Sequence, residues 1–322
     1  MMKLSNMVRG LASDAVAKSL IQNWEHDEGT LTFWRASSNF VYAFDNKQEK
    51  YFLRFSYDQE SSIEQISAEL EFMEYLKSND YPCVSPILSV NGKYIETVMK
   101  SEGTYFAVVF SSAHGNTLDE NITEMQCEDW GRSLASLHQL SKVYEPVSTK
   151  RFNWQDILWK IDAMLQAYPD EKEAIEELDI LTERLQSFAI SNTNYGLIHY
   201  DFQLDNIFYE ENNRVFSVID FDDAVYSWYA LDIVTALDDF LDDDMNLEHS
   251  QVKWFLKGYC SVIPLSNEDI NQFPYFQRLM KLYRFSKLLW SLEGSEVVDA
   301  PKWLDDVKLK FARVRDELRR GF

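Results

Sequence analysis

The sequence predicts an α+β protein of two lobes: a small lobe built on an antiparallel sheet with one main helix, and a larger, mostly helical lobe. Strand-like runs separated by polar turns fill most of the first 112 residues. From about residue 128 onward, apolar residues recur every three or four positions, which is typical of amphipathic helices. No long linker rich in Gly, Ser or Pro interrupts the chain. We therefore expect lobes of residues 1–112 and 113–322 that share a cleft.

The small lobe is expected to alternate strands and turns around one helix. Its first 25 or so residues predict a short amphipathic helix. A turn is expected at Asp45-Asn46. Residues 61–77 predict the main helix, because one apolar stripe runs through Ile66, Leu70, Met73 and Leu76. The strands are expected at 31–34, 41–44, 51–55, 87–90, 94–99 and 105–111.

The large lobe shows helical stripes and one hairpin. Three stripes predict helices: Trp130, Leu134 and Leu137; Ile157, Ile161, Met164 and Leu165; Ile175, Leu178, Leu185 and Phe188. A short strand at 197–198 precedes two further strand-like runs, 207–209 and 215–219. The polar stretch between these runs holds Asn212-Asn213, which tolerates positive φ, and so predicts a β-hairpin. Beyond residue 241 the pattern indicates only helices.

Composition narrows the class of protein. The chain has 322 residues, 46% of them hydrophobic, and a formal net charge of −22. Such a charge repels nucleic acids and anionic membranes, so neither is expected as a partner. No apolar run is long enough to span a bilayer, and the first residues lack the apolar core of a signal peptide. The three Cys form no CxxC pair, which fits a reducing compartment, and we expect a cytoplasmic protein.

The hairpin places polar side chains at its open end. Folding the chain about Asn212-Asn213 is expected to bring Asn206 beside Asp220, with Asp201 in the preceding loop. A carboxylate and an amide oxygen are ligands that suit Mg²⁺, which completes its coordination with water and phosphate oxygens. A separate carboxylate such as Asp201 can accept a proton from a hydroxyl nucleophile. These residue types suit magnesium-assisted phosphoryl transfer.

Two motifs carry a resemblance to a known family. "HYDFQLDN" is His-x-Asp-x-x-x-x-Asn and resembles the catalytic loop of protein kinases and small-molecule kinases. The following "IDFDDAVYSWYALDI" resembles the aminoglycoside phosphotransferase / choline kinase family, and the resemblance extends from about residue 31 to about residue 241. It implies a protein-kinase-like fold, ATP and Mg²⁺ as cofactors, and a small-molecule hydroxyl as acceptor. It also implies Asp201 as catalytic base, His199 as its brace, and Asn206 and Asp220 as metal ligands.

The resemblance also assigns residues of the small lobe to nucleotide binding. "RASSNFVYAFD" is similar to the phosphate-covering turn, which implies Ser37, Ser38 and Asn39 at the phosphates. "YFLRFS" is similar to the third strand, where Arg54 would contact the phosphates and pair with Glu69 on the helix. The adenine is expected near residues 109–113, with Val109 and Ser111 as contacts.

The helical pattern supports the role of Glu69 independently. Its neighbours three and four positions away are Ile66, Phe72 and Met73, so Glu69 is expected on the buried face. A carboxylate on an apolar face needs a cationic partner, and Arg54 on the neighbouring strand can supply it.

Three departures from the kinase pattern bear on the function. The phosphate turn contains no Gly, and Arg stands at position 54 where the family usually has Lys. The metal motif reads Asp-Phe-Asp, and the chain contains no Ala-Pro-Glu. The last two differences disfavour a protein kinase. An atypical protein Ser/Thr kinase and a nucleotide-binding scaffold without catalysis remain the alternatives to a small-molecule kinase.

Several residues admit two interpretations. Asp222 and Asp223 are candidates for contacts with the substrate or a second metal ion, while His138 is more consistent with core packing. The acidic run 238–248 is interpreted as a solvated surface, with an acidic rim for an amine as the alternative. Within the family, the acceptor remains open among aminoglycosides, amino alcohols and homoserine. The acidic composition slightly favours an amine-bearing acceptor, and the sequence defines no oligomeric state.

Overall fold

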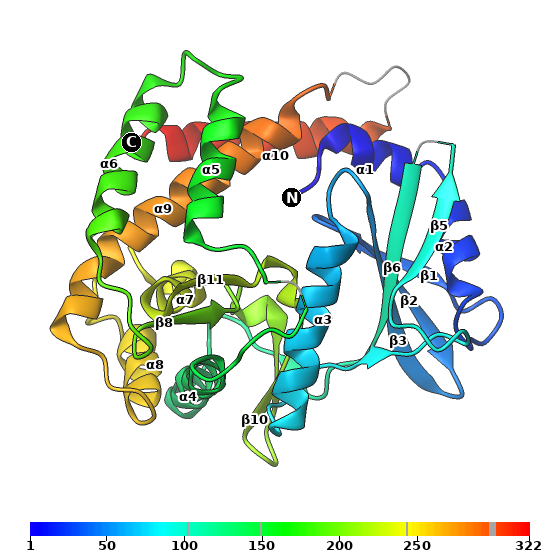
Figure 1. The fold of residues 1–322 in the computed structure, drawn as a ribbon, viewed down its shortest axis with the longest axis horizontal. Helices are drawn as coiled ribbons and strands as arrows, with labels where there is room; N and C mark the ends of the chain where they lie inside the picture. Colours follow the sequence, from blue (N-terminus) through cyan, green and yellow to red (C-terminus); the bar gives the residue numbers. More distant parts are fainter. Residues whose placement is uncertain (102, 149, 243, 296–300) are drawn as a thin grey trace.

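The computed structural model describes residues 1–101, 103–148, 150–242, 244–295 and 301–322. Figure 1 shows a β-sheet on one side of the molecule and most of the helices on the other, with α3 between them. The sheet side comprises α1 (Leu4–Leu11), α2 (Ala15–Ile21), β1 (Thr32–Ala36), β2 (Phe40–Asn46), β3 (Glu49–Tyr57), α3 (Ile63–Ser78), β4 (Pro86–Ile87), β5 (Glu96–Lys100) and β6 (Gly103–Ser111).

The helical side carries three small β elements among its helices. Its helices are α4 (Glu124–Ser141), α5 (Trp154–Leu165), α6 (Lys172–Ser187), α7 (Tyr229–Ala236), α8 (Ser250–Cys260), α9 (Asn267–Leu292) and α10 (Lys302–Arg319). Its strands are β7 (Asn116–Thr117), β8 (Tyr195–Ile198), β9 (Ile207–Glu210), β10 (Val215–Val218) and β11 (Val225–Trp228). Strands β9 and β10 form the predicted hairpin, and β8 pairs with β11.

The large sheet is antiparallel and separates two apolar regions. Its order is β1-β2-β3-β6-β4, and β5 also pairs with β6. On its outer face, Leu53 and Val109 pack with apolar residues of α1 and α2. On the opposite face, Arg54 and Val108 lie across from each other on β3 and β6 and face α3. This alternation places Arg54 at the boundary between the two sides of the molecule.

The C-terminal helix begins against the sheet side and runs back over the helical side. Leu304 on α10 is fully buried in the same apolar cluster as Leu4 and Met7 of α1. Figure 1 shows α10 beginning near α1 and running toward α6, where the C-terminus lies. A hydrogen bond from the Ser291 hydroxyl to the Met2 carbonyl, at 2.8 Å, adds a second connection between the two ends of the chain. The core on the outer face of the sheet is therefore completed by residues from beyond position 300.

Several expected boundaries were wrong for local reasons. The β2–β3 turn lies at Lys47 (φ 53°) and Gln48 (φ 72°), while Asp45 and Asn46 stay paired with β3. A two-residue turn with two positive φ angles matches the twist of a hairpin, and this geometry outweighs the stronger turn preference of Asp-Asn. In the β9–β10 hairpin, Arg214 rather than Asn212-Asn213 takes the positive φ, at 54°.

Side-chain hydrogen bonds explain other differences. Helix α4 begins at Glu124 rather than near residue 128 because Thr123 and Gln126 form a capping box ahead of it. The expected strands at 87–90 and 94–99 shrink to β4 and β5, since the Ser89 hydroxyl accepts the N–H groups of Asn91 and Lys93 in a tight turn. The single N-terminal helix is instead the two short helices α1 and α2. Among the described residues, no helix is both long and apolar enough to cross a bilayer.

Candidate active site

The loop after β8 is held by one buried carboxylate. Asp232, at the start of α7, accepts the backbone N–H of His199 at 2.9 Å and that of Tyr200 at 2.7 Å. It also accepts the His138 Nε2–H from α4 at 2.9 Å. Tyr200 adopts φ 72°, a left-handed conformation that is unfavourable for an aromatic residue. The bonds to Asp232 offset this strain and orient the following residue, Asp201.

His199 braces the loop through its ring. The Ile219 carbonyl can only accept a hydrogen bond, so His199 Nε2 carries the proton and donates to it at 2.9 Å. His199 Nδ1 in turn accepts the Asp201 N–H at 3.2 Å. Burial lowers the pKa of His199, which favours this neutral form. The ring therefore connects the loop of Asp201 to the residue that precedes Asp220.

Asp201 and Asn206 are in direct contact. Asn206 Nδ2 donates to the Asp201 Oδ2 at 2.7 Å and to the Asp201 carbonyl at 3.0 Å. Burial raises the pKa of Asp201 to about 7, and the nearby Asp223 carboxylate adds to this effect. A carboxylate with a pKa near neutrality can both accept and release a proton, which is what a general base requires.

The hairpin brings Asn206 and Asp220 to the same end. The Asn206 carbonyl accepts the backbone N–H of Ile219 at 3.0 Å. Asp220, the expected partner of Asn206, therefore lies one residue beyond the paired position. Asp220 adopts φ 65° and so turns away from the strand. Asn206 Oδ1 is buried and accepts no hydrogen bond from the described residues. A free amide oxygen next to a carboxylate fits a hard divalent cation that takes its other ligands from phosphates and water.

The described residues contain no cluster of three or more His, Cys, Asp or Glu side chains that would bind a metal ion on its own. A cation at this end would therefore depend on Asn206, Asp220 and the oxygens of a bound nucleotide.

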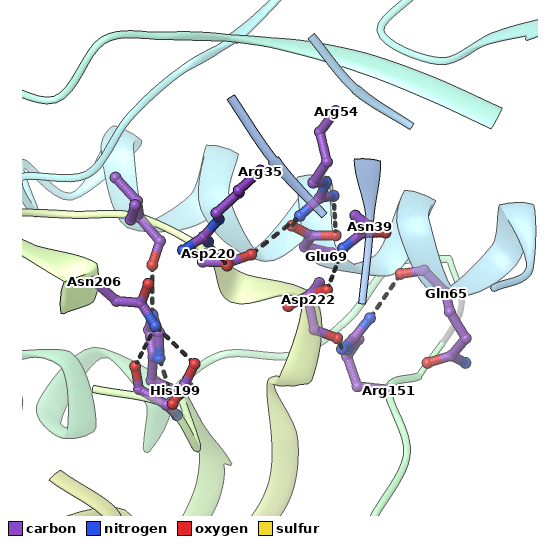
Figure 2. Close-up of polar contacts among 12 residues, drawn as sticks. Arg35, Asn39, Arg54, Gln65, Glu69, Arg151, His199, Asn206, Asp220 and Asp222 are labelled. Carbon is purple, nitrogen blue, oxygen red and sulfur yellow. Dashed lines mark hydrogen bonds and ion pairs between the residues drawn. The ribbon is translucent and has the colours of Figure 1, made fainter. Parts of the chain in front are cut away.

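Two arginines from the sheet reach Asp220, as Figure 2 shows. Arg35 on β1 donates to Asp220 Oδ2 at 2.7 Å, and Arg54 lies 3.6 Å from Oδ1. Arg54 also forms the predicted bidentate pair with Glu69, at 2.8 and 2.7 Å. Burial alone would lower the pKa of Arg54, but the Glu69 carboxylate outweighs it and raises the pKa. The guanidinium thus stays charged at the boundary between the sheet and the hairpin.

The turn between β1 and β2 approaches the same carboxylates. Asn39 Nδ2 donates to Asp222 Oδ2 at 2.5 Å (Figure 2), while the Ser37 carbonyl accepts the Met2 N–H at 3.0 Å. Ser38 and Asn39 line a cavity of about 580 Å³. Two of the three expected phosphate-turn residues therefore face this cavity, and Ser37 is bound to the N-terminal segment.

The structure does not bring Val109 and Ser111 to the other candidates. The Val109 side chain is fully buried in the apolar cluster on the outer face of the sheet, opposite to the Arg54 side. The Ser111 hydroxyl accepts the Ser85 N–H at 3.0 Å. Contact between either residue and an adenine would therefore involve the backbone of β6, and the assignment of their side chains stays a prediction.

Sequence reasoning missed Arg151. It donates from Nε to the Ala224 carbonyl at 2.8 Å, from one terminal nitrogen to the Gln65 carbonyl at 2.9 Å, and from the other to the Asp222 carbonyl (Figure 2). These bonds join the segment after Asp220 to the first turn of α3. No motif surrounds Arg151, so only its three-dimensional contacts reveal this role. His138, expected as core, is fully buried and anchors Asp232.

This cavity, of about 580 Å³, lies between α3, α5, α9 and the segment after Asp220. Asp222 and Asp223 line it, as do Tyr200 and Arg54. Asp201 is not part of the lining but lies close behind it, since Asp223 and Lys287 both influence its pKa. None of the described acids of the 238–248 run lines this cavity. Most of these acids are exposed, as expected for a solvated surface, whereas Asp238 is half-buried and lies 3.6 Å from Arg284.

The site combines a loop with an oriented carboxylate, an amide–carboxylate pair and a buried Arg–Glu pair beneath a sheet. This combination defines the class of kinase-like phosphotransferases. The model of the phosphotransferase enzyme family (APH) matches residues 31–264. The chain belongs to this family. The predicted family and enzyme class, a small-molecule kinase, are thereby confirmed.

Relatives and solved structures agree with the assignment. Amicoumacin kinase of Bacillus subtilis (strain 168) is 27% identical over 267 residues, covering 80% of this chain and 79% of that protein. Homoserine kinase of Methylobacillus glycogenes is 26% identical over 270 residues, covering 81% of each. These names support a small-molecule kinase over a protein kinase or a scaffold.

Structural similarity confirms the two-lobe kinase-like α+β fold. Amicoumacin kinase hAmiN, solved in complex with AMP-PNP, Ca²⁺ and Ami, superposes with a TM-score of 0.81 at 23% identity, covering 96% of this chain and 93% of that one. A microcompartment-associated aminopropanol kinase has a TM-score of 0.70 at 22% identity, covering 96% of this chain and 97% of that one.

Proposed function

We propose that the protein transfers the γ-phosphoryl group of ATP, with Mg²⁺, to a hydroxyl of a small molecule. The observation that carries this proposal is the Asp201–Asn206 contact. It orients a carboxylate whose pKa is raised to about 7, and it leaves the buried Asn206 Oδ1 without a hydrogen bond from the described residues. Asp201 would orient the acceptor hydroxyl and take its proton as the phosphoryl group transfers.

Asn206 and Asp220 would hold the magnesium ion, which neutralises charge on the phosphates when bound. Arg54, kept charged and oriented by Glu69, would contact phosphate oxygens. Arg35 and Asn39 currently connect the β1–β2 segment to Asp220 and Asp222. Nucleotide binding would separate these contacts and turn both side chains toward the phosphates.

The test is the variant Asp201→Asn, with Asp205→Asn as its matched control. Asp205 is an exposed carboxylate four residues further along the same loop. We expect Asp201→Asn to lower kcat by about 10³-fold, because removing a general base costs that order of magnitude. ADP release during turnover of a hydroxyl-bearing acceptor measures the effect.

Nucleotide binding separates loss of chemistry from loss of fold. MgATP should raise the melting temperature of Asp201→Asn as it does that of the wild type, because ligand binding stabilises only the folded state. Equal turnover by wild type and Asp201→Asn would refute the role of Asp201. A loss of activity in Asp205→Asn of the same size would show a nonspecific charge effect instead.

A further inference from the structure

Two lysines face the cavity beside Asp222 and Asp223, and neither has a carboxylate within 4.0 Å among the described residues. Lys160 on α5 and Lys287 on α9 both line it, and both are half-buried. Among the described residues, neither makes a hydrogen bond, nor an ion pair within 4.0 Å. The Lys160 ammonium lies 3.6 Å from the centroid of the Phe152 ring, and that of Lys287 lies 4.4 Å from the Tyr283 ring. Such contacts hold an ammonium in place but leave N–H donors unused.

The other charged groups of the cavity are engaged elsewhere. Arg54 is paired with Glu69, and Arg151 is bound to three backbone carbonyls. Asp222 accepts the Asn39 amide. These contacts occupy both arginines and the acid nearest the metal ligands. The two lysines are left as donors for a bound molecule.

The remaining acids of the lining do not compensate the lysines. Asp58 and Glu60 accept the backbone N–H groups of Thr104 and Lys3 at the rim. Asp223 is the carboxylate that acts most strongly on Lys287 and Lys160, yet it forms no ion pair within 4.0 Å among the described residues. The Met1 ammonium, which also lines the cavity, donates to the Ser38 hydroxyl at 2.8 Å. Lys160 and Lys287 therefore stand out because their N–H donors face the cavity without a hydrogen-bond acceptor among the described residues.

The pKa of Lys160 shows that its charged form is disfavoured in this cavity. Burial lowers its pKa to about 8; Asp223 opposes the shift, and the cations Arg151 and Lys287 add to it. Burial also disfavours the charged form of Lys287, but Asp223 outweighs it and raises the pKa. A further carboxylate in the cavity would stabilise the charged form of Lys160 in the same way. The lysines lie on α5 and α9, on the helical side of the cavity, whereas Arg35 and Arg54 come from the sheet. This position suits the acceptor rather than the nucleotide.

We propose that the phosphoryl acceptor carries a carboxylate in addition to its hydroxyl, and that Lys160 and Lys287 bind this carboxylate. The inference rests on the proposed function and specifies its substrate class as hydroxy acids. Asp223 is placed to hold an amine on the same molecule, so a hydroxy amino acid would pair with Lys160, Lys287 and Asp223. The lysines act on KM for the acceptor, because they bind a group that does not take part in the transfer.

Matched pairs of acceptors test the proposal. Homoserine and 3-amino-1-propanol (aminopropanol below) differ only by the carboxylate, as do serine and 2-aminoethanol. Wild type should use the acid of at least one pair better than its decarboxylated counterpart. Lys160→Met and Lys287→Met should each raise KM for that acid by about 10- to 100-fold, the usual range for one charge-assisted hydrogen bond. KM for the amino alcohol and for ATP should stay within about twofold.

Lys253→Met is the matched control, because Lys253 is an exposed residue of α8 outside the cavity. It should leave both KM values unchanged. Equilibrium binding of each acceptor in the presence of AMP-PNP gives a readout that does not depend on turnover. If the Met variants raise KM for ATP instead, the lysines bind phosphate and the proposal is overturned.

The two proposals fail in distinguishable ways. Phosphorylation of amino alcohols but not of the acids, or equal use of both with unchanged KM in the Met variants, would overturn the inference and leave the kinase proposal intact. Absence of saturable binding by either acid would also overturn the inference. ADP release that does not depend on Asp201 would instead refute the proposed function.

Discussion

Two side chains beside the cavity titrate near neutral pH for related reasons. Burial raises the pKa of Asp201 to about 7 and lowers that of Lys160 to about 8, because in each case it disfavours the charged form. An acid and a base in one region would then both change charge near the pH of ordinary assays. A pH profile of one reaction would mix the two effects, whereas a comparison of two acceptors separates them.

We predict that the preference for a carboxylate-bearing acceptor declines as pH rises through about 8. The groups that act on Lys160 are Asp223, Arg151, Lys287 and, more weakly, Asp156. Lys160 is charged below its pKa and neutral above it, so it attracts a carboxylate only on the acidic side. The ratio of kcat/KM for homoserine to that for aminopropanol reports this loss, since the general base is common to both reactions.

Lys160→Arg provides the control for this profile. An arginine remains charged throughout the accessible pH range, so the ratio should stay flat where that of the wild type falls. A ratio that is independent of pH in the wild type would contradict the assignment of Lys160.

Spacing along the chain was sufficient to predict the central candidates. Asp201, Asn206 and Asp220 lie within one short stretch, and the hairpin between them follows from its strand-like runs. Glu69 could be assigned to the buried face from its helical neighbours, and its pairing with Arg54 is confirmed. Lys160 and Lys287 could not be found this way, because each belongs to a different helix and no motif links them.

At the scale of elements, α4 and α8 pack at the closest approach that backbones allow. A Cβ built on Gly131 would overlap the Phe255 carbonyl, and one built on Gly258 would overlap the Glu128 carbonyl. Both glycines are buried, so two side chains are replaced by direct contact between the helices. This contact lies directly beside Trp130, whose indole N–H donates to the Phe202 carbonyl in the loop that contains Asp201.

We predict that Gly131→Ala and Gly258→Ala each lower the free energy of unfolding by about 1–3 kcal/mol, the usual cost of overpacking. At an exposed helical position the same change would stabilise the helix by up to about 1 kcal/mol, so the sign itself is informative. Urea denaturation measures the difference. Lys253→Ala, at an exposed position of α8, should change stability by less than about 0.5 kcal/mol. Stabilised Gly variants would contradict the observed packing.

Element boundaries were predicted less well than element types. The main helix of the sheet side was expected at 61–77 and is found at Ile63–Ser78, because its apolar stripe is long. Element ends are decided by individual hydrogen bonds, as at the Ser89 turn and at the Thr123 cap that begins α4. Hydrophobic periodicity does not carry that information.

At the scale of the whole molecule, the last helix stabilises the first lobe. Leu304 is fully buried in the apolar cluster shared with α1 and α2, whereas Leu309 on the same helix is 68% exposed. The helical pattern of the C-terminal residues did not predict that this helix packs against α1 and α2. Periodicity predicts that a helix has an apolar face but not which surface covers it.

We predict that Leu304→Ala lowers the free energy of unfolding by about 2–5 kcal/mol, the usual cost of a cavity at a buried leucine. Leu309→Ala should change it by less than about 0.5 kcal/mol. Because α10 packs on the sheet, far-UV circular dichroism and tryptophan fluorescence should follow one transition in both variants. Two separated transitions in the wild type would show that the sheet folds without α10.

The buried carboxylate of Asp232, on α7, also links the loop of Asp201 to helices α4 and α8. Tyr259 on α8 donates to His138, His138 donates to Asp232, and Asp232 holds the backbone that leads to Asp201. Removing the Tyr259 hydroxyl would leave a buried imidazole nitrogen unsatisfied, at a cost of about 1–3 kcal/mol. Substitutions on α8 would therefore alter turnover. The activity would depend on parts of the chain that do not contact a ligand.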